Sequence, residues 1–298
     1  MAERLKIPGL AGELAAEFAG TLILILFGVG VVAQVVAGGI GNHDSIAWAW
    51  GLGVTLGVYV AGRISGAHLN PAVTVALAVF KGFAWRKVLP YSLAQLAGAF
   101  VAALIVRWNY SEVLAKLDPG HTIKTQGVFS TLPGNGAAPV HTGGALRDQI
   151  IGTAILLFLI LAVTDLRNSA PAANLAPFIV GLIVVAIGMA WGTDAGYAIN
   201  PARDLGPRLA SFFTGYGTAF RDQYGGLYFW VPIVGPLIGA VLGAGLYEVL
   251  VGRFLPVSDE DAEPGRAPSE ASSDHPGRHE PPAPRAADAA ERRTESRG

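Results

Sequence analysis

The chain has 298 residues, of which 52% are hydrophobic and 14% are charged, and its formal net charge is −1. Soluble globular domains carry about 25% charged residues, and 16 of the 43 charged side chains here lie after Pro256. The first 256 residues are therefore too apolar for a large soluble protein, and the charge gives no indication of a nucleic-acid partner. The absence of cysteine excludes disulfides and thiolate metal sites.

Six stretches are long and apolar enough to cross a bilayer, whose core of about 30 Å needs roughly 20 helical residues. They are residues 10–37, 46–62, 88–107, 149–164, 175–191 and 227–251. The second and fourth are short for a span, so we expect them to extend into their flanks. The first follows Arg4 and Lys6 without a small-residue cleavage site, which predicts a retained transmembrane helix rather than a signal peptide.

Two further apolar stretches, residues 69–80 and 199–213, are each about half a bilayer long if helical. They begin with the same tripeptide, Asn70-Pro71-Ala72 in the first and Asn200-Pro201-Ala202 in the second. An asparagine caps a helix N-terminus, and a proline is tolerated at the first helical position. Both stretches therefore predict half-helices that enter the membrane and stop, preceded by non-helical backbone that must be buried or line a wet cavity.

The two halves of the chain also repeat one another. Residues 17–21 (EFAGT) parallel residues 149–153 (QIIGT), and each unit holds three spans and one half-helix. Because three spans are an odd number, the second unit must be inserted upside down, as in inverted repeats that build a midplane site. We expect a transmembrane channel domain over residues 1–256, with repeats at about 10–107 and 147–252.

The positive residues predict the orientation in the membrane. Lys81, Arg86 and Lys87 crowd the short connection before the third span, whereas residues 38–45 contain no lysine or arginine. Both termini are therefore predicted to be cytoplasmic, in a plasma (inner) membrane, with residues 108–146 outside. Residues 257–298 are rich in Pro, Ala, Ser and charges, which predicts a disordered cytoplasmic tail.

The chemistry expected at the centre is electrostatic. Two helix N-termini at the midplane, each with roughly half a positive charge, oppose the passage of cations. The amides of Asn70 and Asn200 can donate to a neutral oxygen in place of its hydration. Arg203 is costly in a membrane unless it faces protein or water, which indicates a functional role. The pattern predicts a passive channel that excludes protons and ions.

Residues 65–74 (SGAHLNPAVT) and 196–207 (GYAINPARDLGP) resemble the signature segments of the major intrinsic proteins, the aquaporins and glycerol facilitators. The resemblance covers about residues 10–252. It implies an all-α membrane protein with six tilted helices and two re-entrant half-helices, assembled as a homotetramer in lipid with one pore per subunit. It also implies conduction of glycerol, water and small neutral solutes, with no enzymatic step, no cofactor and no metal.

The resemblance assigns roles to residues at matching positions. The selectivity filter falls on Trp50, Gly188, Tyr197 and Arg203, and the pore midplane on Asn70 and Asn200. The carbonyl groups that line the pore fall on Gly66, Ala67, His68 and Leu69 and on Tyr197, Ala198 and Ile199. Glu17, Gln149 and Asp204 are expected to support the re-entrant loops, and for Asp204 a filter role stays open.

Three residues depart from the family pattern. Gln149 stands where the family usually repeats a glutamate, Tyr197 replaces the more usual phenylalanine, and Leu132 stands where the glycerol branch often has tyrosine. Gly188 favours glycerol, because water-selective relatives commonly have histidine there, but Tyr197 leaves a water-selective channel open. An ion-coupled transporter needs titratable residues along its path, and only Glu17 qualifies. A structural adhesion protein is disfavoured by the asparagine pair and Arg203.

Overall fold

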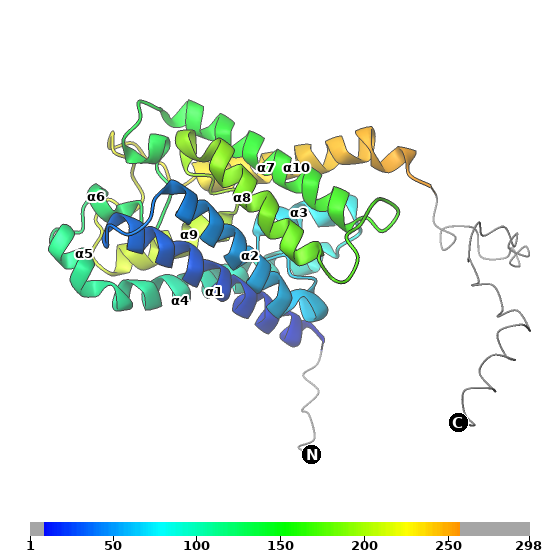
Figure 1. The fold of residues 1–298 in the computed structure, drawn as a ribbon, viewed down its shortest axis with the longest axis horizontal. Helices are drawn as coiled ribbons and strands as arrows, with labels where there is room; N and C mark the ends of the chain where they lie inside the picture. Colours follow the sequence, from blue (N-terminus) through cyan, green and yellow to red (C-terminus); the bar gives the residue numbers. More distant parts are fainter. Residues whose placement is uncertain (1–8, 257–298) are drawn as a thin grey trace, which may run out of the picture. The chain divides into compact units, whose positions relative to one another are not determined.

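The computed structural model describes residues 9–256, and this part of the chain is built from helices (Figure 1). Six of the helices within this range are long and apolar enough to cross a membrane. They are α1 (Gly9–Val36), α2 (His43–Ser65), α4 (Trp85–Asn109), α7 (Thr142–Thr164), α8 (Ala176–Ala195) and α10 (Val231–Leu250). The predicted all-helical, six-span fold is confirmed. The second and fourth spans extend into their flanks as expected, whereas the predicted tail at 257–298 lies outside the described residues.

Two shorter helices, α3 (Pro71–Phe80) and α9 (Pro201–Phe213), are the predicted half-helices. Their starts are fixed by the asparagine before each proline. The side-chain Oδ1 of Asn70 accepts from the backbone N–H of Ala72 at 2.9 Å, and Oδ1 of Asn200 accepts from that of Ala202 at 3.0 Å. The asparagine cap and the proline, whose φ is already helical, therefore start each half-helix directly after the non-helical segment that precedes it.

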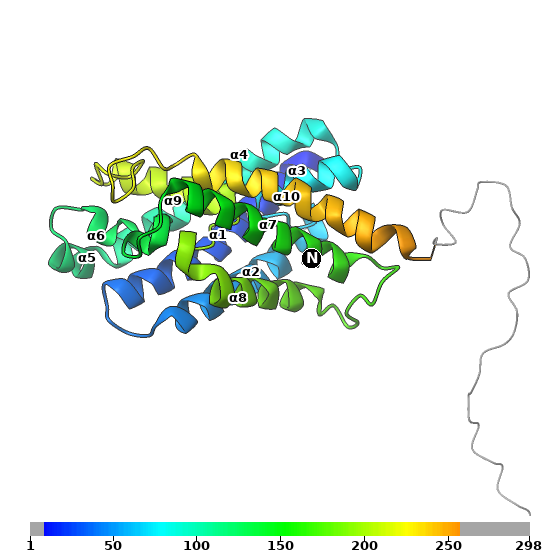
Figure 2. The ribbon, with the colours of Figure 1, turned by 90° about the horizontal axis from the view of Figure 1, so that it is seen from above.

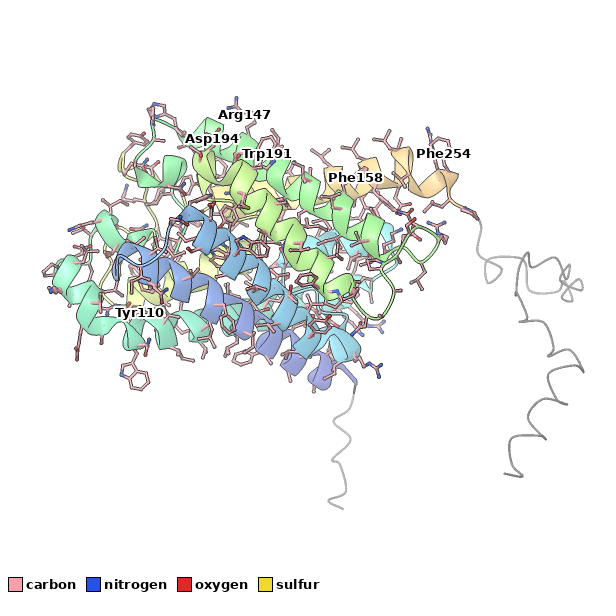
Figure 3. All side chains as sticks on the ribbon, in the orientation of Figure 1. Tyr110, Arg147, Phe158, Trp191, Asp194 and Phe254 are labelled. Carbon is pink, nitrogen blue, oxygen red and sulfur yellow. The ribbon has the colours of Figure 1, made fainter. Side chains whose placement is uncertain are left out.

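The helix bundle has two ends, which we name by what lies there. At the terminal face, α1 begins and α10 ends; at the loop face lie α5 (Ser111–Leu117), α6 (Ile123–Gln126) and the short helix η1 (Pro133–Gly136) (Figures 1 and 2). Figure 3 shows Tyr110 at the loop face and Phe254 at the terminal face. Sequence analysis found no strong pattern in the segment 108–146, and its short helices were not foreseen.

The two repeats pack in the same way, glycine against backbone. A Cβ atom at Gly98 on α4 would overlap the carbonyl oxygen of Phe18 on α1. The equivalent Gly239 on α10 lies just as close to the carbonyl oxygen of Ile150 on α7. Helices in membranes approach closely through such small residues. The equivalent contacts show that the sequence repeat is also a structural one.

The outer surface of the helices is apolar along their length. Large hydrophobic side chains such as Leu89, Leu93 and Leu242 are more than half exposed on helices that contain few charges. A soluble helix places charged residues on its outer face, whereas a helix in lipid keeps apolar side chains there. The surface therefore fits a protein that crosses the bilayer several times.

Candidate functional site

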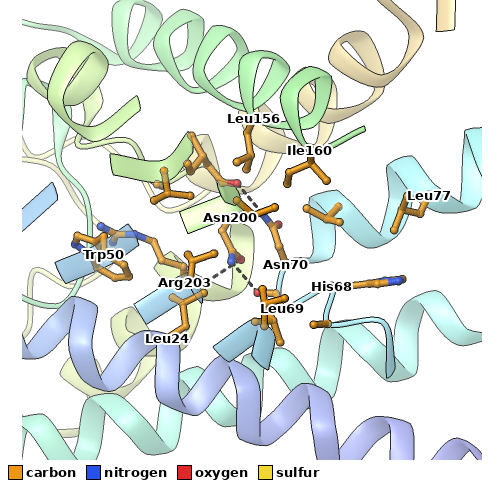
Figure 4. Close-up of a pocket in the computed structure, with 18 of the residues that line it drawn as sticks. Leu24, Trp50, His68, Leu69, Asn70, Leu77, Leu156, Ile160, Asn200 and Arg203 are labelled. Atoms are coloured by element: carbon orange, nitrogen blue, oxygen red, sulfur yellow. Dashed lines mark hydrogen bonds between the residues drawn. The ribbon is translucent and has the colours of Figure 1, made fainter. Parts of the chain in front are cut away.

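A cavity of about 260 Å³ lies where the tips of α3 and α9 meet (Figure 4). Two re-entrant segments, residues 66–70 and 197–200, contribute backbone groups and the two asparagines to its lining. Apart from Trp50 and Arg203, the other lining side chains are nearly all aliphatic: Leu24, Val54, Val58, Val73, Leu77, Leu156, Ile160, Val180 and Val184, with Thr164. A solute in this cavity therefore finds its hydrogen-bonding partners mainly on the re-entrant segments and on Arg203.

The two asparagines at the half-helix tips bond across the midplane. The amide Nδ2 of Asn70 donates to the carbonyl oxygen of Ile199 at 2.8 Å, and Nδ2 of Asn200 donates to that of Leu69 at 2.8 Å (Figure 4). An amide nitrogen carries two hydrogens, so each Asn keeps one for a solute. Both side chains line the cavity. The structure thus brings the predicted midplane pair together at one point of the lumen.

The re-entrant backbone before each asparagine is left-handed at corresponding positions. The φ angles are 85°, 50° and 51° at Gly66, Ala67 and Leu69. They are 64°, 37° and 44° at Gly196, Tyr197 and Ile199. Non-glycine residues hold such angles at a cost of about 1–3 kcal/mol each, which is typical of functional sites. This backbone cannot form helical hydrogen bonds.

Most of the carbonyl groups in these segments have no partner in the protein. Among the described residues, no hydrogen bond reaches the carbonyl oxygens of Gly66, Ala67, His68, Tyr197 or Ala198. All five residues line the cavity. Backbone carbonyl groups are strong acceptors, so a row of them beside a cavity, without partners among the described residues, is suited to accept hydrogen bonds from solutes.

Glu17 on α1 supports the first re-entrant segment. Its Oε1 accepts from Ser65 Oγ at 2.6 Å and from the backbone N–H of His68 at 2.9 Å, and its Oε2 accepts from the N–H of Leu69 at 2.7 Å. Gln95 donates the fourth bond, through Nε2 at 2.7 Å. The carboxylate is fully buried and does not line the cavity. Its position is that of a loop support, while His68 bonds Thr74 Oγ1 through Nδ1 at 3.1 Å.

Gln149 on α7 occupies the equivalent place in the second repeat, with half as many bonds. Its Oε1 accepts from the N–H of Ile199 at 2.9 Å, and its Nε2 donates to the carbonyl oxygen of Ala195 at 2.9 Å. The Nε2 donor, which glutamate lacks, therefore has an acceptor here. An amide suits this site because the N–H of Ile199 needs an acceptor and the carbonyl oxygen of Ala195 needs a donor.

Asp204 in the first turn of α9 does not line the cavity. Its Oδ2 accepts from Thr131, from the backbone N–H at 2.7 Å and from Oγ1 at 2.6 Å, and its Oδ1 accepts from Arg208 Nε at 2.8 Å. Both charged side chains of this ion pair are fully buried. Asp204 therefore binds the loop-face segment through Thr131, and its carboxylate bonds none of the re-entrant residues, 66–70 and 196–199, that it was expected to support.

Three of the four predicted filter residues separate two cavities. Trp50, Tyr197 and Arg203 line the central cavity and also a second one of about 390 Å³ at the loop face, which we call the vestibule. The Arg203 guanidinium lies 3.9 Å from the centre of the Trp50 ring. The fourth residue, Gly188, faces Tyr197, since a Cβ there would be 2.9 Å from Tyr197 Cζ. The structure brings all four together at one constriction.

The polar groups at this constriction are not used by the protein. No hydrogen bond from the Arg203 guanidinium to a described residue is present, although the residue is only 8% exposed. The buried Tyr197 hydroxyl and Trp50 Nε1 likewise have no partner among the described residues. A buried donor without a partner costs about 1–3 kcal/mol, so the site is arranged to bond something that enters it.

Sequence reasoning missed several residues around this site. His43 and Asn135 line the vestibule together with Leu132, which the sequence had already singled out, and Arg208 is fully buried beside Asp204. Two of them left a signal: His43 precedes Trp50 by seven residues, which places both on one helix face, and Arg208 follows Asp204 by four. Among the described residues, no group of three or more His, Asp or Glu is placed to hold a metal ion.

Comparison with known proteins gives consistent results. Residues 4–247 match the model of a family described as Major intrinsic protein. A glycerol uptake facilitator protein from Pseudomonas aeruginosa is 42% identical over 86% of this chain and 94% of its own length. An aquaporin-10 from Milnesium tardigradum is 44% identical over 83% of this chain and 64% of its own. The X-ray structure of the aquaglyceroporin from Plasmodium falciparum superimposes with a TM-score of 0.74 at 33% identity, covering 82% of this chain and 98% of that one.

Proposed function

The chain belongs to the major intrinsic protein family, and we propose that it is a passive membrane channel for glycerol, other small neutral solutes and water. The observation that carries the proposal is the constriction, where a guanidinium with free N–H groups lies against the ring of Trp50. An aromatic face accommodates CH groups, and the fork of Arg203 donates to hydroxyl oxygens. A polyol has one carbon side and one oxygen side, which matches this pairing.

The relatives support the same activity. Two bacterial relatives, from Pseudomonas aeruginosa and Escherichia coli, are named glycerol uptake facilitators, and the solved structure is that of an aquaglyceroporin. A Cβ at Gly188 would lie 2.9 Å from Tyr197 Cζ, so a larger residue there would displace the phenol ring. The cavity beyond the proposed filter combines aliphatic side chains with polar backbone groups, which suits the carbon and oxygen atoms of a polyol.

Exclusion of ions follows from the charges that face the lumen. Two helix N-termini, each with about half a positive charge, meet at Asn70 and Asn200, and Arg203 adds a full charge toward the loop face. An ion-coupled transporter is not supported, because both oxygens of Glu17 are occupied by donors. We propose that conduction involves no chemical step.

The proposed setting is a homotetramer in a plasma (inner) membrane, with the terminal face toward the cytoplasm. Lys81 pairs with Glu248 near the end of α10, and Lys87 pairs with Glu13 near the start of α1, so this positive cluster lies at the terminal face. Positive residues favour the cytoplasmic side. Exposed apolar side chains on the spans would contact lipid or neighbouring subunits.

A second candidate, a water-selective channel of the same fold, is favoured by one observation. The ring of Tyr197 already occupies the side of Gly188, where a Cβ would lie 2.9 Å from Cζ. If the Tyr197 phenol leaves no room beside Trp50 for the CH groups of glycerol, only water passes. The two candidates differ in glycerol flux and not in water flux.

Stopped-flow light scattering on proteoliposomes distinguishes the two candidates. Vesicles in a sucrose gradient report water exit, and vesicles in a glycerol gradient report glycerol re-entry. We expect both to exceed the rates of empty vesicles, and we expect Gly188→His combined with Trp50→Phe to depress glycerol flux more than water flux. Glycerol entry at the rate of empty vesicles, with fast water exit, would establish the water-selective candidate instead.

A further inference from the structure

We propose that His43 is a positioning residue of the filter, which holds the ring of Tyr197 and so sets which solutes pass. The inference rests on the proposed function, because it concerns the selectivity of the same constriction. His43 is the first residue of α2, two helical turns before Trp50, and its side chain lines the vestibule together with Tyr197 and Arg203. None of the roles assigned above to filter residues includes it.

The imidazole of His43 is bonded to the backbone of a filter residue. Its Nε2 lies 2.8 Å from the carbonyl oxygen of Gly188. Because a carbonyl only accepts, Nε2 carries the hydrogen and donates it. The bond joins the start of α2 to α8 at the level of the constriction, across 145 residues of sequence.

The same ring fills a groove on α8 that two glycines create. A Cβ at Gly192 would lie 2.5 Å from His43 Cε1, and a Cβ at Gly188 would lie 2.9 Å from Tyr197 Cζ. The helix is broken between these glycines, at Trp191, where φ is −123° and ψ is 15°. Histidine and tyrosine thus occupy adjacent parts of one groove, at the place where α8 leaves regular geometry.

Tyr197 depends on these neighbours for its position. Its hydroxyl has no partner among the described residues, so no hydrogen bond of its own fixes the ring. The rings of His43 and Tyr197 meet edge to face, with centroids 6.3 Å apart and an interplanar angle of 86°. Removing the imidazole would free space beside the phenol on the side of Gly192, and the ring could then move away from the lumen.

Asn135 makes a second hydrogen bond to the same turn of α8. Its Nδ2 donates to the carbonyl oxygen of Gly192 at 2.8 Å. The end of α8 therefore keeps one anchor when His43 is removed. A change confined to the filter, rather than unfolding of the helix end, is the expected result.

The experiment compares three solutes in the same proteoliposomes: water, glycerol and the longer polyol erythritol. His43→Ala should raise the ratio of erythritol to glycerol permeability by about threefold or more, the scale of one lost hydrogen bond. His43→Gln keeps an amide donor and should stay close to the ratio of the unmodified protein. General damage lowers all three fluxes together and leaves the ratio unchanged.

His141 provides a matched control, since it is a second exposed histidine at the loop face, packed on Tyr224 at a centroid distance of 4.9 Å. His141→Ala should leave the ratio unchanged. If His43→Ala does not reconstitute, His43→Ser tests the same contact, because it also removes the imidazole, and the ratio should rise in the same direction.

Two results overturn the inference. In a chain that conducts glycerol, an unchanged ratio in His43→Ala and His43→Ser shows that the imidazole does not set selectivity. An equal shift in His43→Ala and His43→Gln shows that the donor is not what matters. If the unmodified chain conducts neither glycerol nor water above empty vesicles, the proposed function fails as well, so the two failures can be told apart.

Discussion

The two half-helices have nearly the same backbone but are held in different ways. α3 is supported from behind, by the Glu17 carboxylate of a spanning helix that accepts four hydrogen bonds. In the second repeat Gln149 takes the place of Glu17 but makes only two hydrogen bonds. α9 has an additional support in Asp204, which binds Thr131 and Arg208. The repeat therefore specifies backbone geometry, while the polar contacts that stabilise each half have diverged. The half that carries the filter arginine is anchored to the loop face.

The largest expected effect comes from removing the two supports in turn. Glu17→Ala leaves the N–H groups of His68 and Leu69 without an acceptor and removes the shortest bonds of Ser65 and Gln95. It should cost about 4 kcal/mol, whereas Gln149→Ala should cost about 2 kcal/mol. Thermal unfolding of the detergent-solubilised protein measures both. Equal losses of stability would mean that the two supports are equivalent and that the comparison is wrong.

A slightly smaller loss is expected at the loop-face anchor. Asp204→Asn leaves the buried Arg208 without its counter-charge, which should cost about 3 kcal/mol. Because an amide has one acceptor oxygen in place of two, either Thr131 or Arg208 loses its acceptor, and glycerol flux should fall even in protein that remains folded. Flux per folded channel, with folded protein counted by size-exclusion chromatography, is the measurement. Normal glycerol flux in the folded fraction would show that the Asp204 contacts stabilise the protein without affecting conduction.

Exchanging the two support residues sharpens the comparison further. Gln149→Glu places a carboxylate oxygen against the carbonyl oxygen of Ala195, and Glu17→Gln places an N–H group against donors, so each should cost about 1–3 kcal/mol. The first expectation runs against the family pattern, which has glutamate at this position. Melting temperatures of the single and double variants test it, and a more stable Gln149→Glu variant would contradict it.

The smallest effect is a local loosening of the loop face. The Arg107 guanidinium has only donors, so in its 2.7 Å bond to His121 the imidazole Nε2 is the acceptor. His121→Phe removes this acceptor and should speed hydrogen exchange in residues 118–131. His121→Gln, which keeps an acceptor, should exchange at the rate of the unmodified protein. Equally fast exchange in both variants would show that the bond does not hold this segment.

The Asp118 carboxylate stabilises the same segment through its hydrogen bonds. Burial alone would raise the pKa of Asp118, but hydrogen bonds from Thr125 and Thr122 outweigh it and lower the pKa. A lowered carboxyl pKa stabilises the folded state fully above the unfolded value of about 3.9 and is lost only on further acidification. Its contribution is therefore constant between pH 5 and 8.

The sequence was sufficient for the features that local physics determines. Span length, the Asn-Pro helix starts and the repeat predicted the six spans and both half-helices, because bilayer thickness and helix capping act over short distances. The segment 108–146 has no apolar period, so α5, α6 and the bond from Thr131 to Asp204 could not be foreseen. The bond of His43 could not be foreseen for a different reason: its partner Gly188 lies 145 residues away, and the spacing from Trp50 indicated only a shared helix face.

The reciprocal amide bonds at the half-helix tips also constrain how the chain is made. During synthesis, Asn70 emerges 129 residues before Ile199, and Leu69 emerges 131 residues before Asn200. Contacts of such long separation form late, because the entropy of closing the intervening chain must be overcome first. The first repeat therefore waits in the bilayer with an unsatisfied tip until the second has been inserted. Neither repeat forms a pore alone, and the lumen comes into existence only when both halves of the nascent chain meet.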